Sequence, residues 1–315
     1  MKELNHLHHI TLCVGDAQED YDFHTQVLGL RSVKKTLLYD GQVPIYHLYY
    51  GNADGQPGSI VTTFAMRHTG IKGRQGTNQI KTLMLAIPEG SAGFWLNRLR
   101  QHGFDATEGE RFGEKRVSFV HPHGIPYVLV ETPSNGRRAF EGADVPKDSG
   151  IYGMHGIEVN VRDTDVMDDF LTGAWSSDPV ADEAAVKRYQ MGKGGSSTHI
   201  DIVKDPDSPQ GSWTFGEGIV HHCAFDIDSL EKQEQYKLFV EGLGYTDFSD
   251  RKDRGYFDSV YVRTPGGALF EAAVTKPKAW AEDEAPEHIG EDIMVSPQFS
   301  HKKDEIIAML GPIKY

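Results

Sequence analysis

Apolar and polar positions alternate over many short stretches of this chain, and stretches with helical spacing separate some of them. Residues 7–14 (LHHITLCV) alternate as a strand with two distinct faces does. A helix is expected to begin at Asp16, with Glu19 three residues later as in a capping box, and to stop near Gly29. Three further strands, rich in β-branched and aromatic residues, are expected at residues 32–40, 44–51 and 58–66. The pattern at this end predicts the order βαβββ.

The same order recurs toward the other end of the chain. Residues 219–227 (IVHHCAFDI) predict a strand, and Asp228 and Glu231 repeat the capping spacing before a helix that ends near Gly242. Residues 258–274 predict a hairpin with Thr-Pro-Gly-Gly as its turn. Weaker copies of the pattern lie between, at residues 80–132 and 154–205. The repeats predict an α+β fold of four βαβββ modules.

The modules suggest how the chain is divided. Residues 1–134 are expected to hold modules one and two, residues 135–150 a linker, residues 151–276 modules three and four, and residues 277–315 a C-terminal tail. A single module has one apolar sheet face that it cannot cover. Two modules can close their sheets into a half-barrel around a cavity, so we expect two half-barrel domains.

Composition narrows the class of protein. The 315 residues are 38% hydrophobic and 10% aromatic, which suits a globular protein with a core. No apolar run approaches the roughly 20 residues of a membrane helix, and a net charge of -14 without a basic stripe argues against nucleic acid. Cys13 and Cys223 do not indicate a disulfide framework, so we expect two buried thiols in the cytoplasm.

Two His-His pairs stand at the start of the first and last modules. Because side chains alternate along a strand, His9 and Thr11 share one face, as do His222 and Ala224 in the later strand. Only one histidine of each pair can therefore point straight into a given cavity. Two such pairs at equivalent positions favour a shared chemical role.

Glu271 interrupts an otherwise apolar strand (GALFEAAV). A buried carboxylate without a partner costs several kcal/mol, and a divalent cation is a strong partner. With His9 and His222 it would form a two-His-one-carboxylate set, which leaves positions open as in non-haem Fe(II) oxygenases. His155 occupies the position of His9 in its own module and is the rival third ligand. Structural or surface roles are expected for His24, His47, His121 and His123.

These segments together resemble the vicinal-oxygen-chelate superfamily, which includes glyoxalases and extradiol dioxygenases. Within it, LHHITLCVGDAQEDYDF, GEGIVHHCAFDI and SVYVRTPGGALFEAAVT are similar to the hydroquinone-type ring-cleaving dioxygenases, such as the chlorohydroquinone 1,2-dioxygenases. The resemblance implies an Fe(II) enzyme whose iron is held by His9, His222 and Glu271. It also implies that modules one and four pair around the metal, which argues against His155.

The resemblance implies further site residues around that iron. His8 and His221 are expected to act in catalysis as proton carriers, and Thr11 to contact the substrate. Arg254 and Tyr261 are expected both to bind substrate and to take part in catalysis. Ordinary alternatives for the last two are a surface ion pair of Arg254 with Asp250 or Asp253, and core packing of Tyr261.

The implied reaction inserts both atoms of O2 into a hydroquinone or substituted hydroquinone by 1,2-cleavage, in the degradation of aromatic compounds. The expected partners are a small aromatic para-diol and O2, with a second copy of the chain as a further candidate. One alternative is a glyoxalase-like isomerase or lyase, but that chemistry usually takes a fourth protein ligand, and Thr62 stands at the corresponding position. The other alternative is a protein that binds an aromatic compound without catalysis.

Overall fold

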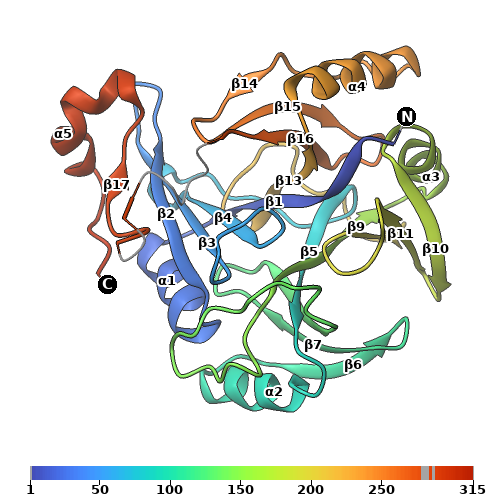
Figure 1. The fold of residues 1–315 in the computed structure, drawn as a ribbon, viewed down its shortest axis with the longest axis horizontal. Coiled ribbons are helices and arrows are strands. Elements are labelled where there is room, and N and C mark those ends of the chain that lie inside the picture. The colour runs from blue at the N-terminus through green and yellow to red at the C-terminus, as the bar shows by residue number, and fades with distance from the viewer. Residues whose placement is uncertain (1, 278–283, 286–287, 315) are drawn as a thin grey trace.

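Two curled sheets lie side by side in the computed structural model, which describes residues 2–277, 284–285 and 288–314 (Figure 1). The larger sheet contains, in spatial order, β14 (Lys252–Asp253), β15 (Phe257–Arg263), β16 (Leu269–Thr275), β13 (Ile219–Ile227), β1 (Leu4–Val14), β4 (Ile60–Ala65), β3 (Ile45–Gly51), β2 (Arg31–Leu38) and β17 (Ile293–Met294). The smaller sheet contains β10 (Ser177–Glu183), β11 (Val186–Met191), β12 (His199–Lys204), β9 (Gly153–Val161), β5 (Gln79–Ile87), β8 (Pro126–Glu131), β7 (Glu114–Val120) and β6 (Thr107–Arg111).

This arrangement confirms the predicted α+β fold with two half-barrel sheets. The larger sheet joins the strands of the first and last modules, and the smaller sheet joins those of the second and third. No helix or strand occurs over residues 132–152, all of which the structure describes. The domain boundaries at 134 and 151 stay predictions. Part of the expected tail, residues 278–283, 286–287 and 315, lies outside the described residues.

The helices lie on the outer sides of the sheets (Figure 1). They are α1 (Ala17–Asp22), α2 (Ala92–Gln101), α3 (Asp165–Asp169), α4 (Leu230–Gly242) and α5 (Lys303–Ile307), with π-helical turns at Phe23–Val27 and Phe170–Ala174 and 3₁₀ turns at Arg67–Thr69 and Pro297–Lys302. Large buried side chains such as Trp95, Trp175 and Tyr236 belong to the core that joins helices and sheets. The helices thus cover the apolar outer faces.

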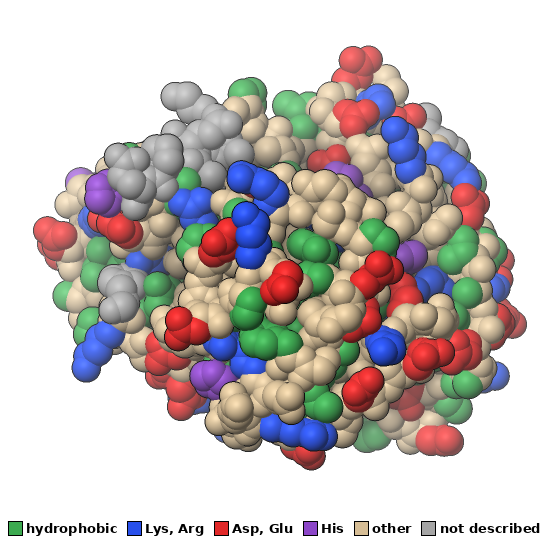
Figure 2. Space-filling view, turned by 60° about the horizontal axis from the view of Figure 1, so that its bottom comes forward, with side chains coloured by type: hydrophobic (Ala, Val, Ile, Leu, Met, Phe, Trp, Pro, Cys, Tyr) green, Lys and Arg blue, Asp and Glu red, His purple; other side chains and the backbone are tan. Residues whose placement is uncertain are grey.

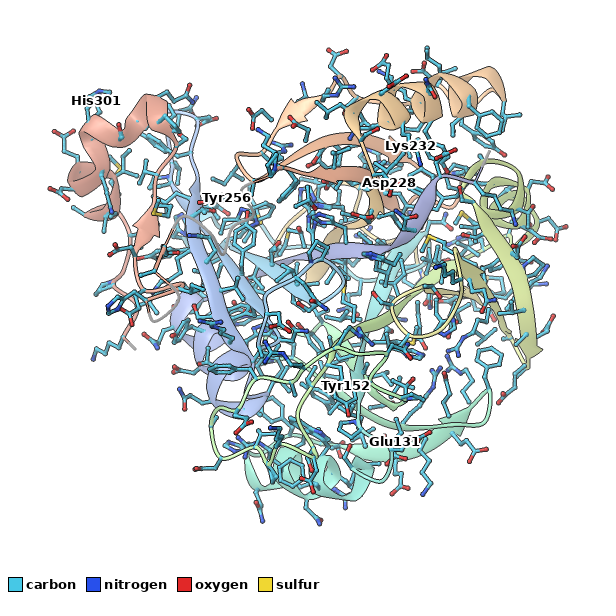
Figure 3. The ribbon with its side chains drawn as sticks, viewed as in Figure 1. Glu131, Tyr152, Asp228, Lys232, Tyr256 and His301 are labelled. Atoms are coloured by element: carbon cyan, nitrogen blue, oxygen red, sulfur yellow. The ribbon has the colours of Figure 1, made fainter. Side chains whose placement is uncertain are left out.

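The N-cap residue predicted from the sequence is correct for α1 and wrong for α4. Asp16 does cap α1, because its carboxylate accepts hydrogen bonds from two backbone N–H groups. At α4 the prediction of Asp228 was wrong: Ser229 is the cap and accepts from the N–H of Lys232. Asp228 instead accepts from the Lys232 ammonium at 2.6 Å (Figure 3). Asp228 and Ser229 are adjacent residues of types that both cap helices, so the sequence allows either register.

Strand register repeats within the larger sheet. The parallel pair β1 and β4 aligns Thr11 with Thr62, and the parallel pair β13 and β16 aligns Ala224 with Glu271. Between these pairs, β1 and β13 run antiparallel and align Thr11 with His222. Thr62 therefore holds in the first module the place that Glu271 holds in the last.

The surface carries charges of both signs, and both cysteines are buried. On the face in Figure 2, acidic and basic side chains are interspersed between larger uncharged areas. In the described part of the chain, the helices are too short or too polar to span a bilayer. Cys13 and Cys223 are both free and buried.

Candidate metal centre

Three side chains from three strands converge on the inner face of the larger sheet. Nε2 of His9 lies 3.2 Å from Nε2 of His222, and Oε2 of Glu271 lies 2.9 Å from His222 Nε2 and 3.8 Å from His9 Nε2. All three side chains are buried, with Glu271 fully inaccessible. Neighbouring donors around a six-coordinate ion bound at about 2.1 Å lie about 3 Å apart. The distances between the three donor atoms fit one shared metal ion, with a wider angle at the metal between His9 and Glu271 than between the other two pairs.

The two oxygens of Glu271 have different surroundings. Oε1 accepts a hydrogen bond from the Ser259 hydroxyl. Oε2 is buried and has no hydrogen-bond partner among the described residues, although His222 Nε2 lies 2.9 Å away. The contact to His222 is short but lacks hydrogen-bond alignment, so we treat Oε2 as unsatisfied. A buried carboxylate oxygen left in this way is suited to a cation.

A β-bulge places the first histidine of each pair beside the second. Between β1 and β13 the register shifts at His8 on one strand and at His221 on the other, so each is the extra residue of an irregularity. As a result, Nδ1 of His8 lies 2.8 Å from Nδ1 of His9, and Nδ1 of His221 lies 2.8 Å from Nδ1 of His222. The doubled histidines therefore form two hydrogen-bonded pairs.

These pairs determine which nitrogen is available to a metal. If His9 donates its Nδ1 proton to His8, its Nε2 keeps a free lone pair, and the His8 proton lies on Nε2, 2.8 Å from the Thr275 hydroxyl. The same reasoning applies to His222 and His221. A metal-bound histidine usually donates its other ring N–H to such a partner.

Burial keeps both imidazoles neutral. It lowers the pKa of His9 to about 3, opposed by the Glu271 carboxylate and helped by His222. Burial also lowers the pKa of His222 to about 3, helped by Arg254. Neutral imidazole is the form that binds metal ions.

Thr11 contacts the proposed ligands directly. Its hydroxyl lies 3.1 Å from His222 Nε2 and 2.7 Å from the Thr62 hydroxyl. Thr62 thus takes the place of a fourth protein ligand and offers a hydroxyl that is engaged with Thr11. The donor set therefore contains three strong ligands, not the four of the glyoxalase-like alternative.

Arg254 and Tyr261 form a pair at one side of the triad. The Arg254 Nε–H donates to the Tyr261 hydroxyl at 3.0 Å, and the Tyr261 ring meets the His222 ring edge to face at 5.5 Å between centroids. The alternative of an ion pair of Arg254 with Asp250 or Asp253 is not found among the described residues, and Asp253 instead binds Lys276 at 2.6 Å. Burial and the nearby Glu271 carboxylate raise the pKa of Tyr261, so its phenol is protonated.

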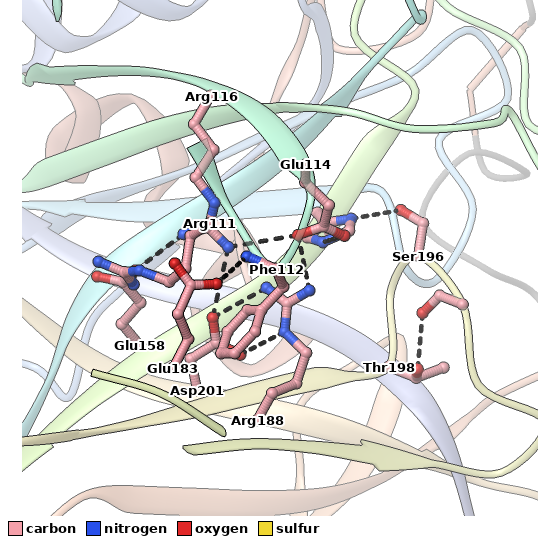
Figure 4. A network of polar contacts seen from close by, with 12 residues as sticks. Arg111, Phe112, Glu114, Arg116, Glu158, Glu183, Arg188, Ser196, Thr198 and Asp201 are labelled. Atoms are coloured by element: carbon pink, nitrogen blue, oxygen red, sulfur yellow. Dashed lines mark hydrogen bonds and ion pairs between the residues drawn. The ribbon is translucent and has the colours of Figure 1, made fainter. Parts of the chain in front are cut away.

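The structure brings His155 to a different place. It lies in β9 of the smaller sheet, with Nε2 3.1 Å from Glu114 Oε1 and its ring 4.7 Å from the His199 ring. However, Arg188 donates to Glu114 at 2.6 Å and to Asp201 at 2.7 Å (Figure 4). A guanidinium already neutralises this carboxylate and would repel a divalent ion. This second triad is therefore the weaker metal candidate.

Asp20, His24 and His121 form a third cluster, in which protein groups already satisfy the hydrogen bonds. Oδ2 of Asp20 accepts from the hydroxyls of Tyr50 at 2.8 Å and Thr63 at 2.6 Å. Oδ1 lies 3.1 Å from His121 Nε2, and His24 Nε2 lies 2.9 Å from the Tyr127 hydroxyl. With these contacts satisfied, the cluster has the character of a structural network.

Sequence reasoning missed Ser259. It aligns with Ala273 across β15 and β16, two residues along the strand from the pairing of Tyr261 with Glu271. Alternation in FDSVYVR places Ser259 and Tyr261 on one face, and this was the available signal. The hydrogen bond to Glu271 could be anticipated only once the two strands were known to pair.

Comparison with known proteins now identifies the family. The Glyoxalase/Bleomycin resistance protein/Dioxygenase superfamily matches residues 6–136. Chlorohydroquinone/hydroquinone 1,2-dioxygenase from Sphingobium indicum is 43% identical over 308 residues, which is 97% of this chain and 95% of that protein. The chain belongs to the ring-cleaving dioxygenases of this superfamily.

Solved structures agree with this assignment. A Bacillus subtilis protein provisionally named a dioxygenase has a TM-score of 0.91 at 33% identity, and the match covers 100% of this chain and 99% of that one. Glyoxalase I from Zea mays has a TM-score of 0.62 at 13% identity, over 85% of this chain and 92% of that one, which shows the shared fold alone. This ring-cleaving dioxygenase therefore has the superfamily fold, and His9, His222 and Glu271 lie together as candidate metal ligands inside one half-barrel.

Proposed function

We propose that this dioxygenase uses Fe(II), held by His9, His222 and Glu271, to cleave a hydroquinone or substituted hydroquinone between a hydroxyl-bearing carbon and its neighbour. The observation that carries the proposal is the unsatisfied Oε2 of Glu271 beside two neutral imidazoles. Two histidines and one carboxylate leave positions for substrate and O2, as in non-haem Fe(II) oxygenases. The named relative from Sphingobium indicum supports the substrate class.

Bound iron would supply electron transfer between the aromatic ring and O2, and it would acidify a bound hydroxyl. Residues around the proposed ligands would orient the substrate and stabilise its charge. Thr11 and Tyr261 offer hydroxyls on the same face as the triad, where they can orient a substrate oxygen. Arg254 adds a positive charge at Tyr261 that stabilises an anionic substrate.

His8 and His221 are proposed to carry protons as well as to orient the ligands. Each lies within hydrogen-bond distance of a ligand histidine. His8 continues the path to the Thr275 hydroxyl, and the His221 ring stacks on Phe215 at 3.9 Å between centroids. The burial of the triad excludes water from the reacting groups. A cytoplasmic location and association with a second copy stay predictions.

Oxygen consumption tests this function directly. The protein is stripped of metal, reconstituted anaerobically with Fe(II), and mixed with hydroquinone and its chloro, methyl and methoxy derivatives. We expect equimolar loss of O2 and ring substrate, and ¹⁸O₂ should label the open-chain product. Zn(II)-loaded protein is the control and should consume no O2. Absence of O2 uptake with every hydroquinone would reject the proposal.

A further inference from the structure

His47 lies on the same face of the larger sheet as the triad, although its sequence context suggested a structural role. In β3 and β4, His47 aligns with Phe64 and Tyr49 aligns with Thr62. Thr62 in turn aligns with Thr11 across β4 and β1. Aligned residues on neighbouring strands project from the same side of a sheet. His47 and Tyr49 therefore share the face of Thr11 and the proposed ligands.

One nitrogen of His47 lacks a partner. Its Nδ1 lies 3.2 Å from the Tyr49 hydroxyl, and its ring packs against that of Phe64 with centroids 4.5 Å apart. Its Nε2 is inaccessible and has no hydrogen-bond partner within the described residues. A buried polar atom left in this way costs about 1–3 kcal/mol. Such an atom beside a candidate active site is suited to a polar group of a bound ligand.

The contacts of Tyr49 indicate where the His47 proton lies. Burial lowers the pKa of His47, helped by the positive charge of Arg254, so its imidazole is neutral. Burial raises the pKa of Tyr49, so its phenol keeps a proton to donate to Nδ1 of His47. If Tyr49 donates that proton to Nδ1, the single imidazole proton of His47 lies on Nε2. His47 offers an N–H donor at its free atom.

The position of β3 determines what that donor can reach. Sheet order places β4 and β3 on one side of β1, whereas β13, β16 and β15 lie on the other. His47 therefore approaches the triad from the side opposite to Tyr261. The two oxygens of a para-diol lie at opposite ends of the ring. A ring with one oxygen at the triad needs a polar group for the other.

We propose that Nε2 of His47 donates a hydrogen bond to the far hydroxyl of a para-diol whose near hydroxyl lies at the triad. This proposal rests on the proposed function and assigns its selectivity for para-diols to one residue. It predicts that hydroquinone binds more tightly than phenol, which has the near hydroxyl alone. The difference should depend on His47.

Two substitutions distinguish the role of Nε2 of His47 from that of Nδ1. His47→Asn keeps a polar group near the place of Nδ1, and His47→Gln places an amide N–H near the place of Nε2. Dissociation constants of hydroquinone and phenol are measured by anaerobic calorimetry on the Fe(II)-loaded enzyme, and steady-state kinetics follow in air. His301→Asn, a change of an exposed histidine in the tail, is the control (Figure 3).

We expect hydroquinone to bind about tenfold more tightly than phenol in the unmodified enzyme, the effect of one hydrogen bond. His47→Asn should remove this preference without changing phenol affinity or iron content, and His47→Gln should restore much of it. Equal preference in His47→Asn and the unmodified enzyme would overturn the role of His47. If hydroquinone shows the His47-dependent preference but no O2 is consumed, the proposed function fails and the contact stands. Binding of neither compound would overturn both.

Discussion

At the scale of single residues, each proposed ligand is held through the atom that it does not offer to a metal. His9 and His222 are held through Nδ1, and Glu271 is held through Oε1 by Ser259. Such partners set the orientation and basicity of ligands, and their loss typically lowers metal affinity by about 10–100-fold. The hydrogen bond from Ser259 to Glu271 can be removed without substituting any proposed metal ligand.

Ser259→Ala should weaken Fe(II) binding by about tenfold, because Oε1 loses its donor and the carboxylate loses its fixed orientation. Titration of the metal-free protein with Fe(II) under anaerobic conditions measures the change. Ser300→Ala, at an exposed serine of the tail, is the control. Unaltered Fe(II) affinity in Ser259→Ala would show that the hydrogen bond to Glu271 has no part in holding the metal.

Strand alternation and the cost of burying a carboxylate nominated His9, His222 and Glu271 from local neighbours in the sequence. The same pattern left His155 as a rival ligand, and only the family resemblance argued against it. Ser259 and the free nitrogen of His47 were not accessible in this way. Their roles depend on which distant strands pair and in what register. Local pattern contains no information on that pairing.

At the scale of elements, two β-bulges create the environment of the site. A regular strand would direct His8 and His221 away from the histidines that follow them. The irregularities between β1 and β13 instead bring each adjacent pair of rings to hydrogen-bond distance. Simple alternation predicted only that one histidine of each pair faces the cavity, because a bulge leaves no clear mark in the sequence.

His221→Ala should lower Fe(II) affinity by about 10–100-fold, since Nδ1 of His222 loses its partner. His221→Asn retains a polar group at that distance and should recover part of the affinity. Both variants are compared by anaerobic Fe(II) titration, with circular dichroism to verify the fold. Identical affinities for the alanine variant and the unmodified protein would contradict an orienting role for the bulged residue.

At the scale of the whole molecule, the two half-barrels have similar strands but different interiors. The larger sheet surrounds a carboxylate with an unsatisfied oxygen, whereas the smaller sheet contains a network in which arginines neutralise the acids (Figure 4). The four-module architecture was predictable from repeats and helix signals. The different interiors were not, because Glu114 and Arg188 belong to modules that meet only in the folded sheet.

Arg188→Met should destabilise the protein by about 3 kcal/mol, because buried Asp201 then keeps only Arg116, at 3.6 Å, as a cationic partner. Iron content per folded chain should not change, since this network is separate from the proposed centre. Urea unfolding and metal analysis check the two outcomes. Lys187→Met removes a more exposed ion pair with Asp168 and should cost less than about 1 kcal/mol. Loss of iron in Arg188→Met would implicate the second triad.

Stability should fall as the pH is lowered below about 6.5, even in metal-free protein. Burial lowers the pKa of nine histidines below the ordinary value: His8, His9, His47, His102, His121, His155, His199, His221 and His222. The unfolded chain then binds protons that the folded chain does not, at about 1.4 kcal/mol per pH unit for each histidine. Urea unfolding with chelator at pH 7.5 and pH 5.5 measures this, and equal stability at both would contradict it.

The proposed function requires that His9, His222 and Glu271 bind a single iron ion. The most direct measurement is anomalous X-ray diffraction at the iron absorption edge, on crystals of protein reconstituted anaerobically with Fe(II). We predict one strong anomalous peak within bonding distance of His9 Nε2, His222 Nε2 and Glu271 Oε2. Iron found instead beside Glu114, His155 and His199, or no iron bound by the three proposed ligands, would contradict the account.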